Sequence, residues 1–169
     1  MKDAPFMLEW IHDDAIVHCL RKDFAAKTIQ DCREFIFRAA DESESIHLAI
    51  VNDKDEYMGT VSLKHIRQNT AEFAIVLRGC AMGRGYASFA MKEIFDYGYR
   101  VRRINFIYWC TDPENRRSVR FYEKCGFQRC DIPEQAKGYT EAERQAYIWY
   151  SVKMTSSPAE TGRMYEREI

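Results

Sequence analysis

Hydrophobic and polar positions divide the chain into an opening helical part, a run of short strands, and a closing part in which helices and strands alternate. Residues 6–20 carry apolar side chains at a helical period that is interrupted near its middle, which predicts two short helices. A third helix is predicted to begin at Thr28, because Asp31 stands where a capping box has its acidic residue. The chain is therefore expected to enter its fold through helices, without a strand before them.

Three strand-like runs follow, at residues 46–51, 57–66 and 71–77, separated by short polar turns. Connections of this length cannot hold a helical crossover, so they predict an antiparallel meander. This arrangement argues against a dinucleotide-binding fold, which would need parallel strands joined by helices at this point.

The second half alternates between helices and strands. Apolar residues from Ala87 to Gly98 recur at three- and four-residue steps, which predicts a helix packed by one side onto a sheet. The remaining elements are expected to be a strand over 104–109, a helix over 115–124 that ends at Gly126, a short strand after Phe127, a polar link over 131–144 and a last strand over 145–154.

Composition narrows the function classes. A chain of 169 residues fits one domain, placed here at 1–154 with a C-terminal tail over 155–169. A net charge of −1 gives no reason to expect binding to nucleic acid or to a membrane surface. The start lacks a signal-peptide pattern, so a cytoplasmic protein is expected. The six cysteines form no Cys-x-x-Cys pair and no zinc-like spacing with the four histidines, so reduced thiols and no metal are expected.

A glycine-rich stretch links the meander to the first long helix of the second half. Glycine lets the backbone approach a ligand closely, and the following helix directs unpaired N–H groups toward whatever lies there, which favours an anion. Taken alone the motif is weak, because a turn into a helix with no ligand has the same residues. The residues of this candidate site are Met82, Gly83, Arg84, Gly85, Tyr86 and Ala87.

A second and more specific motif runs from Asn115 to Phe127. It has an asparagine, a small residue three positions on, a tyrosine seven positions on and a final Gly-Phe. With the strand, glycine-rich loop, helix and strand before it, this motif resembles the GNAT (GCN5-related N-acetyltransferase) superfamily over residues 6–154. The resemblance implies an α+β (mixed α/β) fold, in which helices flank a central twisted sheet that is mixed but mostly antiparallel.

The resemblance also implies a co-substrate, acetyl-coenzyme A. The glycine-rich loop is expected to hold its pyrophosphate, and the backbone of Val76 and Leu77 to pair with the pantetheine amides. Asn115 and Ser118 share one helix face, where an asparagine and a hydroxyl suit an amide-rich ligand. Met82 departs from the family, which usually has Gln or Arg at this place and so gains a side-chain contact.

Acetyl transfer from a thioester to an amine needs a neutral amine, a stabilised oxyanion and a proton for the leaving thiolate. Tyr122 resembles the family's proton donor, although its position also fits plain core packing. Glu72 is a candidate base, with a solvated strand residue as the alternative. Cys110 is a weaker candidate, for a covalent two-step route, because no histidine lies near it in sequence. Among the histidines, His65 is the best placed to belong to a site.

The opening part resembles the branch that contains ribosomal-protein N-terminal, spermidine and nucleotide-amino-sugar acetyltransferases. The favoured function is acetyl transfer, by direct attack in a ternary complex, to a primary amine of a small molecule such as a polyamine or an amino sugar. A protein N-terminal acetyltransferase and a non-catalytic acyl-coenzyme A sensor remain alternatives, and a homodimer is left open. A cluster of acidic residues could attract a cationic amine or be a solvated helix face: Glu9, Asp13, Asp14, Asp23 and Asp31.

Overall fold

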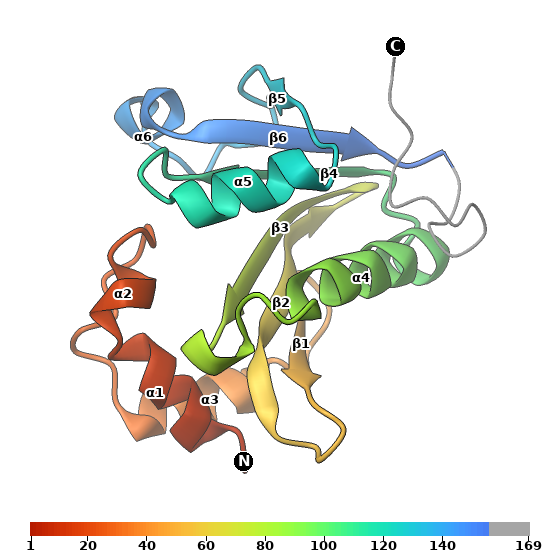
Figure 1. The fold of residues 1–169 in the computed structure, drawn as a ribbon. Helices are drawn as coiled ribbons and strands as arrows, with labels where there is room; N and C mark the ends of the chain where they lie inside the picture. The colour runs from red at the N-terminus through yellow and green to blue at the C-terminus, as the bar shows by residue number, and fades with distance from the viewer. Residues whose placement is uncertain (156–169) are drawn as a thin grey trace.

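The computed structural model describes residues 1–155, so the predicted tail lies almost wholly outside the described residues. Its helices are α1 (Ala4–Ile11), α2 (Asp14–Val17), α3 (Ile29–Arg38), the short 3₁₀ helix η1 (Gly79–Ala81), α4 (Tyr86–Arg102), α5 (Arg116–Lys124) and α6 (Glu141–Ala146). Its strands are β1 (Ile46–Val51), β2 (Tyr57–Arg67), β3 (Thr70–Leu77), β4 (Phe106–Thr111), β5 (Arg129–Cys130) and β6 (Ile148–Lys153). Figure 1 shows these elements around one twisted sheet.

The six strands form one sheet in the order β1-β2-β3-β4-β6-β5. Strands β3 and β4 are parallel and every other neighbouring pair is antiparallel. The predicted meander is confirmed, and so is the mixed, mostly antiparallel sheet. The parallel pair is joined through α4, which places the glycine-rich stretch between two neighbouring strands.

Helix α4 is longer than its predicted stripe, and the strand after it begins later. Arg103 adopts a left-handed backbone with φ of 58°, which ends α4, and the N–H of Ile104 bonds to the carbonyl of Gly98. Ile104 thus belongs to the turn that closes the helix. At Gly98, an added Cβ would meet Leu63 Cδ1 at 2.7 Å, so glycine here lets α4 lie close against β2.

The polar link over 131–144 contains a helix that the sequence interpretation missed. Thr140 and Glu143 form a complete capping box at the start of α6, in which each side chain bonds to the other's backbone N–H. Because α6 extends to Ala146, β6 begins at Ile148 rather than at 145. The signal was present in the sequence as a threonine followed three residues later by a glutamate.

Side chains of β2 and β3 alternate between an apolar face and a polar face of the sheet. Leu63 and Phe73 are paired across the strands and are buried in the main core, where the ring of Phe73 meets that of Phe95 from α4 at 5.1 Å. The opposite face carries Thr60 and Ser62 and lies toward the opening helices. The two faces of the same strands therefore serve different parts of the molecule.

Helices α1 and α3 pack together over a second cluster that includes Trp10, Cys32 and Tyr57. The indole N–H of Trp10 donates to the hydroxyl of Tyr57 at 3.2 Å, which joins α1 to β2. Within the described chain, no helix combines the length and the apolar character needed to cross a bilayer.

Candidate active site

Strands β3 and β4 pair only over their first residues and then diverge. The last matched pair is Glu72 with Tyr108, and no pairing of β3 with β4 is found beyond it in the described chain. Figure 1 shows the strands separating toward the side where α1 and α2 lie. The rest of β3 thus offers a free backbone edge.

Strand alternation tells which backbone groups face this edge. The N–H of Arg78 bonds to the carbonyl of Met58, so the residues at even spacing from it, including Val76, direct their backbone toward β2. The N–H and C=O groups of Ile75 and Leu77 then face the open side. The backbone contact with pantetheine stays a prediction for both residues. The register favours Leu77, and the side chain of Val76 lines a cavity on the polar face.

The glycine-rich loop has the backbone that an anion site needs. Gly83 and Gly85 have φ values of 75° and 87°, in the left-handed region that favours glycine, and a Cβ at either position would meet nothing within 4 Å. Gly85 is the N-cap of α4 and brings no side chain to the first turn. The N–H groups that follow, from Tyr86 and Ala87, are therefore available to a phosphate.

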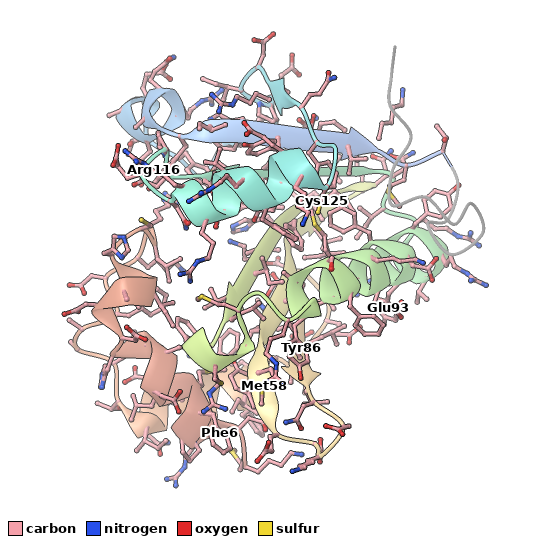
Figure 2. The ribbon with its side chains drawn as sticks, viewed as in Figure 1. Phe6, Met58, Tyr86, Glu93, Arg116 and Cys125 are labelled. Carbon is pink, nitrogen blue, oxygen red and sulfur yellow. The ribbon has the colours of Figure 1, made fainter. Side chains whose placement is uncertain are left out.

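Helices α4 and α5 both begin at the side toward which the strands diverge, as Figure 2 shows from Tyr86 and Arg116. The guanidinium of Arg117 contacts the sulfur of Met82, which joins the start of α5 to the loop. Arg117 was not recognised from the sequence, although it stands within the second motif. Arg117 supplies a cation beside the loop, which the uncharged side chain of Met82 cannot do. Arg84, within the loop, is exposed.

Asn115 has a structural role that the sequence interpretation did not assign. Its Oδ1 accepts a hydrogen bond from the N–H of Ser118 at 3.1 Å, which caps α5. Asn115 and Ser118 do lie together at the helix start, as their spacing predicts. The cap fixes the direction of α5 and so the place of Tyr122, two turns further on.

Tyr122 is buried among aromatic side chains. Its ring lies 5.4 Å from Trp109 and 5.2 Å from Tyr150, and burial raises the pKa of its phenol. A phenol held protonated can donate a proton. The two interpretations of Tyr122, packing and proton donation, are therefore compatible in this structure.

A cavity of about 530 Å³ lies between the opening helices and the polar face of β2 and β3. Its floor consists of alternate residues of the two strands, and its other walls come from α1, α3, the segment before α3 and the link before α6. The floor residues are Thr60, Ser62, Lys64, Glu72, Ala74 and Val76.

Glu72 is the buried acid of this cavity, with a residue exposure of 4%. Its Oε1 accepts hydrogen bonds from Lys64 Nζ and from the Tyr139 hydroxyl, each at 2.8 Å. His65 Nε2 lies 3.7 Å from its other oxygen. The alternative of a solvated strand residue is thus wrong, because β2, β3 and the link before α6 enclose the side chain. A buried carboxylate fixed by two donors beside open space is suited to accept a proton from a substrate.

Tyr139 lies between Glu72 and the thiol of Cys110 on β4. Its hydroxyl also accepts from Cys110 Sγ at 3.5 Å, and the same thiol is near enough to Tyr122 to contribute to its raised pKa. Burial raises the pKa of Cys110 itself to about 11, so this thiol stays protonated and is a poor nucleophile. Tyr139 was missed in the sequence because nothing in its neighbourhood resembles a motif.

Arg21 closes the space between the opening helices and the link before α6. Its guanidinium lies 4.1 Å from the centre of the Tyr139 ring, and its Nε donates to Glu143 at 2.7 Å. A further N–H donates to the carbonyl of Gly138 at 2.5 Å. A polypeptide acceptor would need an open groove between the opening helices and the link before α6, and these contacts bridge that groove at this point.

Most of the opening acidic residues serve the protein itself rather than a ligand. Glu9 pairs with Arg78 at 2.7 Å, Asp13 caps α2, and Asp23 accepts from the N–H of Ala25. Asp31 lines the cavity, but it accepts from Thr28 and from Lys27. The hypothesis that this cluster attracts a cation is not supported. Among the described residues, no group of three or more His, Cys, Asp or Glu side chains is placed to hold a metal ion.

Comparison with known proteins agrees with this geometry. The family profile described as acetyltransferase (GNAT) domain matches residues 1–128. The chain belongs to the GNAT acetyltransferase family. The described architecture also matches a solved family member, the spermidine N-acetyltransferase of Vibrio cholerae in complex with CoA and spermine. The TM-score is 0.73 over 90% of each chain, at 18% sequence identity.

Two relatives are similar to this chain in sequence. The spermidine N(1)-acetyltransferase of Escherichia coli K12 is 34% identical over 67 residues, which is 40% of this chain and 36% of that protein. The alignment thus spans little more than a third of the relative's length. The uncharacterized N-acetyltransferase YnaD of Bacillus subtilis strain 168 is 28% identical over 76% of this chain and 75% of its own.

Proposed function

We propose that this protein transfers an acetyl group from acetyl-coenzyme A to a primary amine of a small molecule, by direct attack in a ternary complex. The observation that carries the proposal is the place of Glu72, buried at the point where β3 and β4 part. The acceptor cavity and the open edge of β3 meet there. The similar spermidine acetyltransferases support a small amine as the acceptor class.

The residues present fit acetyl-coenzyme A. The loop N–H groups and Arg117 would hold the pyrophosphate, and the free backbone edge at Ile75 and Leu77 would pair with the pantetheine amides. Acetyl-coenzyme A supplies the acetyl group as a thioester. The N–H of Leu77 is the proposed donor to the oxygen that gains negative charge during attack.

Two proton transfers complete the proposed reaction. Glu72 would accept the proton that the attacking amine loses, directly or through a water molecule. Tyr122 would donate a proton to the departing sulfur, for which its raised pKa keeps it in the acid form. Lys64 and Arg21 place positive charge beside the cavity, and this favours the neutral, nucleophilic form of a bound amine.

Two observations weigh against the alternatives. A covalent route would need a reactive thiolate at Cys110, and burial keeps this thiol protonated. A polypeptide acceptor would need an open groove, and the contacts of Arg21 with Glu143 and Gly138 bridge it.

The proposal is tested by cofactor binding and by turnover, measured separately. Millimolar acetyl-coenzyme A should raise the Tm of the full chain, since a ligand that binds the folded state stabilises it. Release of free coenzyme A should depend on an added amine, with intersecting initial-velocity lines and full activity in Cys110→Ser. Parallel lines and an inactive Cys110→Ser would point to the covalent route. Binding without turnover on any amine would support the sensor.

A further inference from the structure

The walls of the cavity carry more positive than negative charge. Two carboxylates line it, Glu72 and Asp31, against five lysine and arginine side chains. Those five are Arg21, Lys22, Lys27, Arg38 and Lys64. This distribution is the opposite of what a site for several ammonium groups requires, because each ammonium group needs acceptors of its own.

Both carboxylates already have cationic or hydrogen-bonding partners within the protein. Glu72 accepts from Lys64 and Tyr139, and Asp31 accepts from Lys27, from the N–H of Thr28 and from its hydroxyl. One ammonium group at Glu72 can lose its proton and react. A second ammonium group would find no unpartnered carboxylate in the wall of the cavity, as the described residues form it.

Two cations of the wall remain available to a ligand. Lys22 makes no ion pair and no side-chain hydrogen bond within the described chain, and it is exposed. Among the described residues Arg38 contacts its helix neighbour Glu34, through a 3.4 Å hydrogen bond from Nε to the carbonyl and a 4.0 Å exposed ion pair of a kind that contributes little. Lys22 and Arg38 can therefore turn to an anionic group of a substrate.

The half-buried His47 lies in the positive electrostatic field of the same wall. His47 bonds to Ser62 at 2.8 Å on the cavity floor. Its pKa is lowered by burial first and then by the charges of Lys64 and Lys22. Two cations from different segments thus act on one point of the wall, and His47 is kept neutral there.

We infer that the acceptor is a small amine that also carries an anionic group, a carboxylate or a phosphate, which binds at Lys22 and Arg38 while its amine lies at Glu72. The inference rests on the proposed function and names its substrate class. A carboxylate or phosphate would be held by charge-assisted hydrogen bonds. Hydroxyl groups of the same molecule could bond to Thr60 and Ser62 on the floor.

The test uses amines in matched pairs that differ only in the anionic group. Lysine is compared with cadaverine, and phosphoethanolamine with ethanolamine, with spermidine as the polyamine arm. The readout is kcat/KM for release of coenzyme A by the full chain. The anionic member of at least one pair should be favoured by about 10-fold or more, the effect of one hydrogen bond between charged groups. The pair that responds tells whether carboxylate or phosphate is preferred.

A charge reversal at the wall locates the effect. Lys22→Glu should lower kcat/KM for the anionic member by about 10-fold and should not lower that of its partner without the anionic group. Lys54→Glu, an exposed lysine in the turn between β1 and β2, is the matched control and should change neither. A higher kcat/KM of the wild type for spermidine or cadaverine than for the anionic amines would overturn the inference.

A binding experiment tests the anion site independently of the proposed activity. Each amine is added to the protein with saturating coenzyme A, which cannot react, and the Tm is measured. The anionic members should raise the Tm of the wild type and not that of Lys22→Glu. If no amine is turned over but this pattern holds, the proposed activity fails and the anion site stands. If cationic amines alone raise the Tm, the anion site fails whatever the activity.

Discussion

The two sides of the candidate site offer different groups to a ligand: backbone groups on the proposed cofactor side and side chains on the proposed acceptor side. On the cofactor side the chain offers backbone groups: the open edge of β3 at Leu77 and the first turn of α4 after Gly85. On the acceptor side it offers side chains, above all Glu72 with its partners. Backbone contacts depend on conformation and tolerate changes of residue type. Side-chain contacts depend on identity, so substitutions on the acceptor side should change what reacts, while those on the cofactor side should change how well the common co-substrate binds.

The largest expected effect is that of Tyr122→Phe, at the junction of the two sides. Removing the proton donor should lower kcat by about 100-fold and leave the KM for acetyl-coenzyme A within about twofold, because general acid catalysis acts in the transition state. Initial rates with saturating acetyl-coenzyme A measure this. The ring keeps its contacts with Trp109 and Tyr150, so the Tm should stay close to that of the wild type. An unchanged kcat would mean that Tyr122 contributes only to core packing and is not the proton donor.

Glu72→Gln should come next, with a fall of about 30-fold in kcat/KM for the amine near neutral pH, within the usual range for loss of a general base. The amide keeps the shape of the side chain and can still accept from Lys64 and Tyr139. A protonated amine must lose one proton before it attacks and a second one afterwards, so the deficit should shrink, without vanishing, as the pH rises toward the pKa of the amine. The exposed Glu93→Gln on α4 is the control. A deficit that is constant with pH would assign Glu72 to binding instead.

Gly85→Ala tests the cofactor side alone. An alanine at φ of 87° carries backbone strain of about 1–2 kcal/mol, so the loop should shift, and the KM for acetyl-coenzyme A should rise by about 10-fold. The KM for the amine should not change. Gly138→Ala is a matched control, because Gly138 is not among the positive-φ glycines and an added Cβ there meets nothing within 4 Å. Equal effects of both substitutions on the KM for acetyl-coenzyme A would contradict a role of the glycine-rich loop in binding it.

Tyr139→Phe should give a smaller effect on the acceptor side. The carboxylate of Glu72 would lose one of its two hydrogen bonds, a contribution of about 1 kcal/mol, so kcat/KM for the amine should fall by about fivefold. A purely structural role would lower the Tm and leave kcat/KM for the amine unchanged. The KM for acetyl-coenzyme A should be unchanged.

The same comparison explains which features of the site could be predicted from the sequence. Gly83, Gly85 and the Asn115 to Phe127 motif act through local conformation, which local sequence determines, and they were recognised. Tyr139 is 67 residues from Glu72 in the chain, and only the folding of the link before α6 over β3 brings them together. Arg21 and Glu143 are 122 residues apart. Such pairs have no spacing that a motif can record.

Val76 shows a different limit of what a strand sequence can predict. Adjacent residues of a strand direct their backbone groups to opposite edges, so a motif known to within one residue cannot tell which one faces the ligand. The pairing of Arg78 with Met58 settles this for β3. The charge of the cavity was also hidden, because acidic residues crowd the opening sequence. Their partners, such as Arg78 for Glu9, come from elsewhere in the chain.

The smallest effect concerns the closure of the acceptor side by Arg21. Its hydrogen bond, with those from the N–H and hydroxyl of Thr140, lowers the pKa of Glu143 from 4.5 to about 2. A carboxylate with a depressed pKa in the folded state stabilises the fold above its unfolded pKa, and this contribution is lost as the pH falls through the folded value. Glu143→Gln should therefore have a lower Tm than the wild type at neutral pH, and the difference should shrink between about pH 4.5 and 2, the two pKa values. A difference that does not depend on pH would mean that the capping geometry of α6, rather than the charge of Glu143, holds the link in place over the cavity.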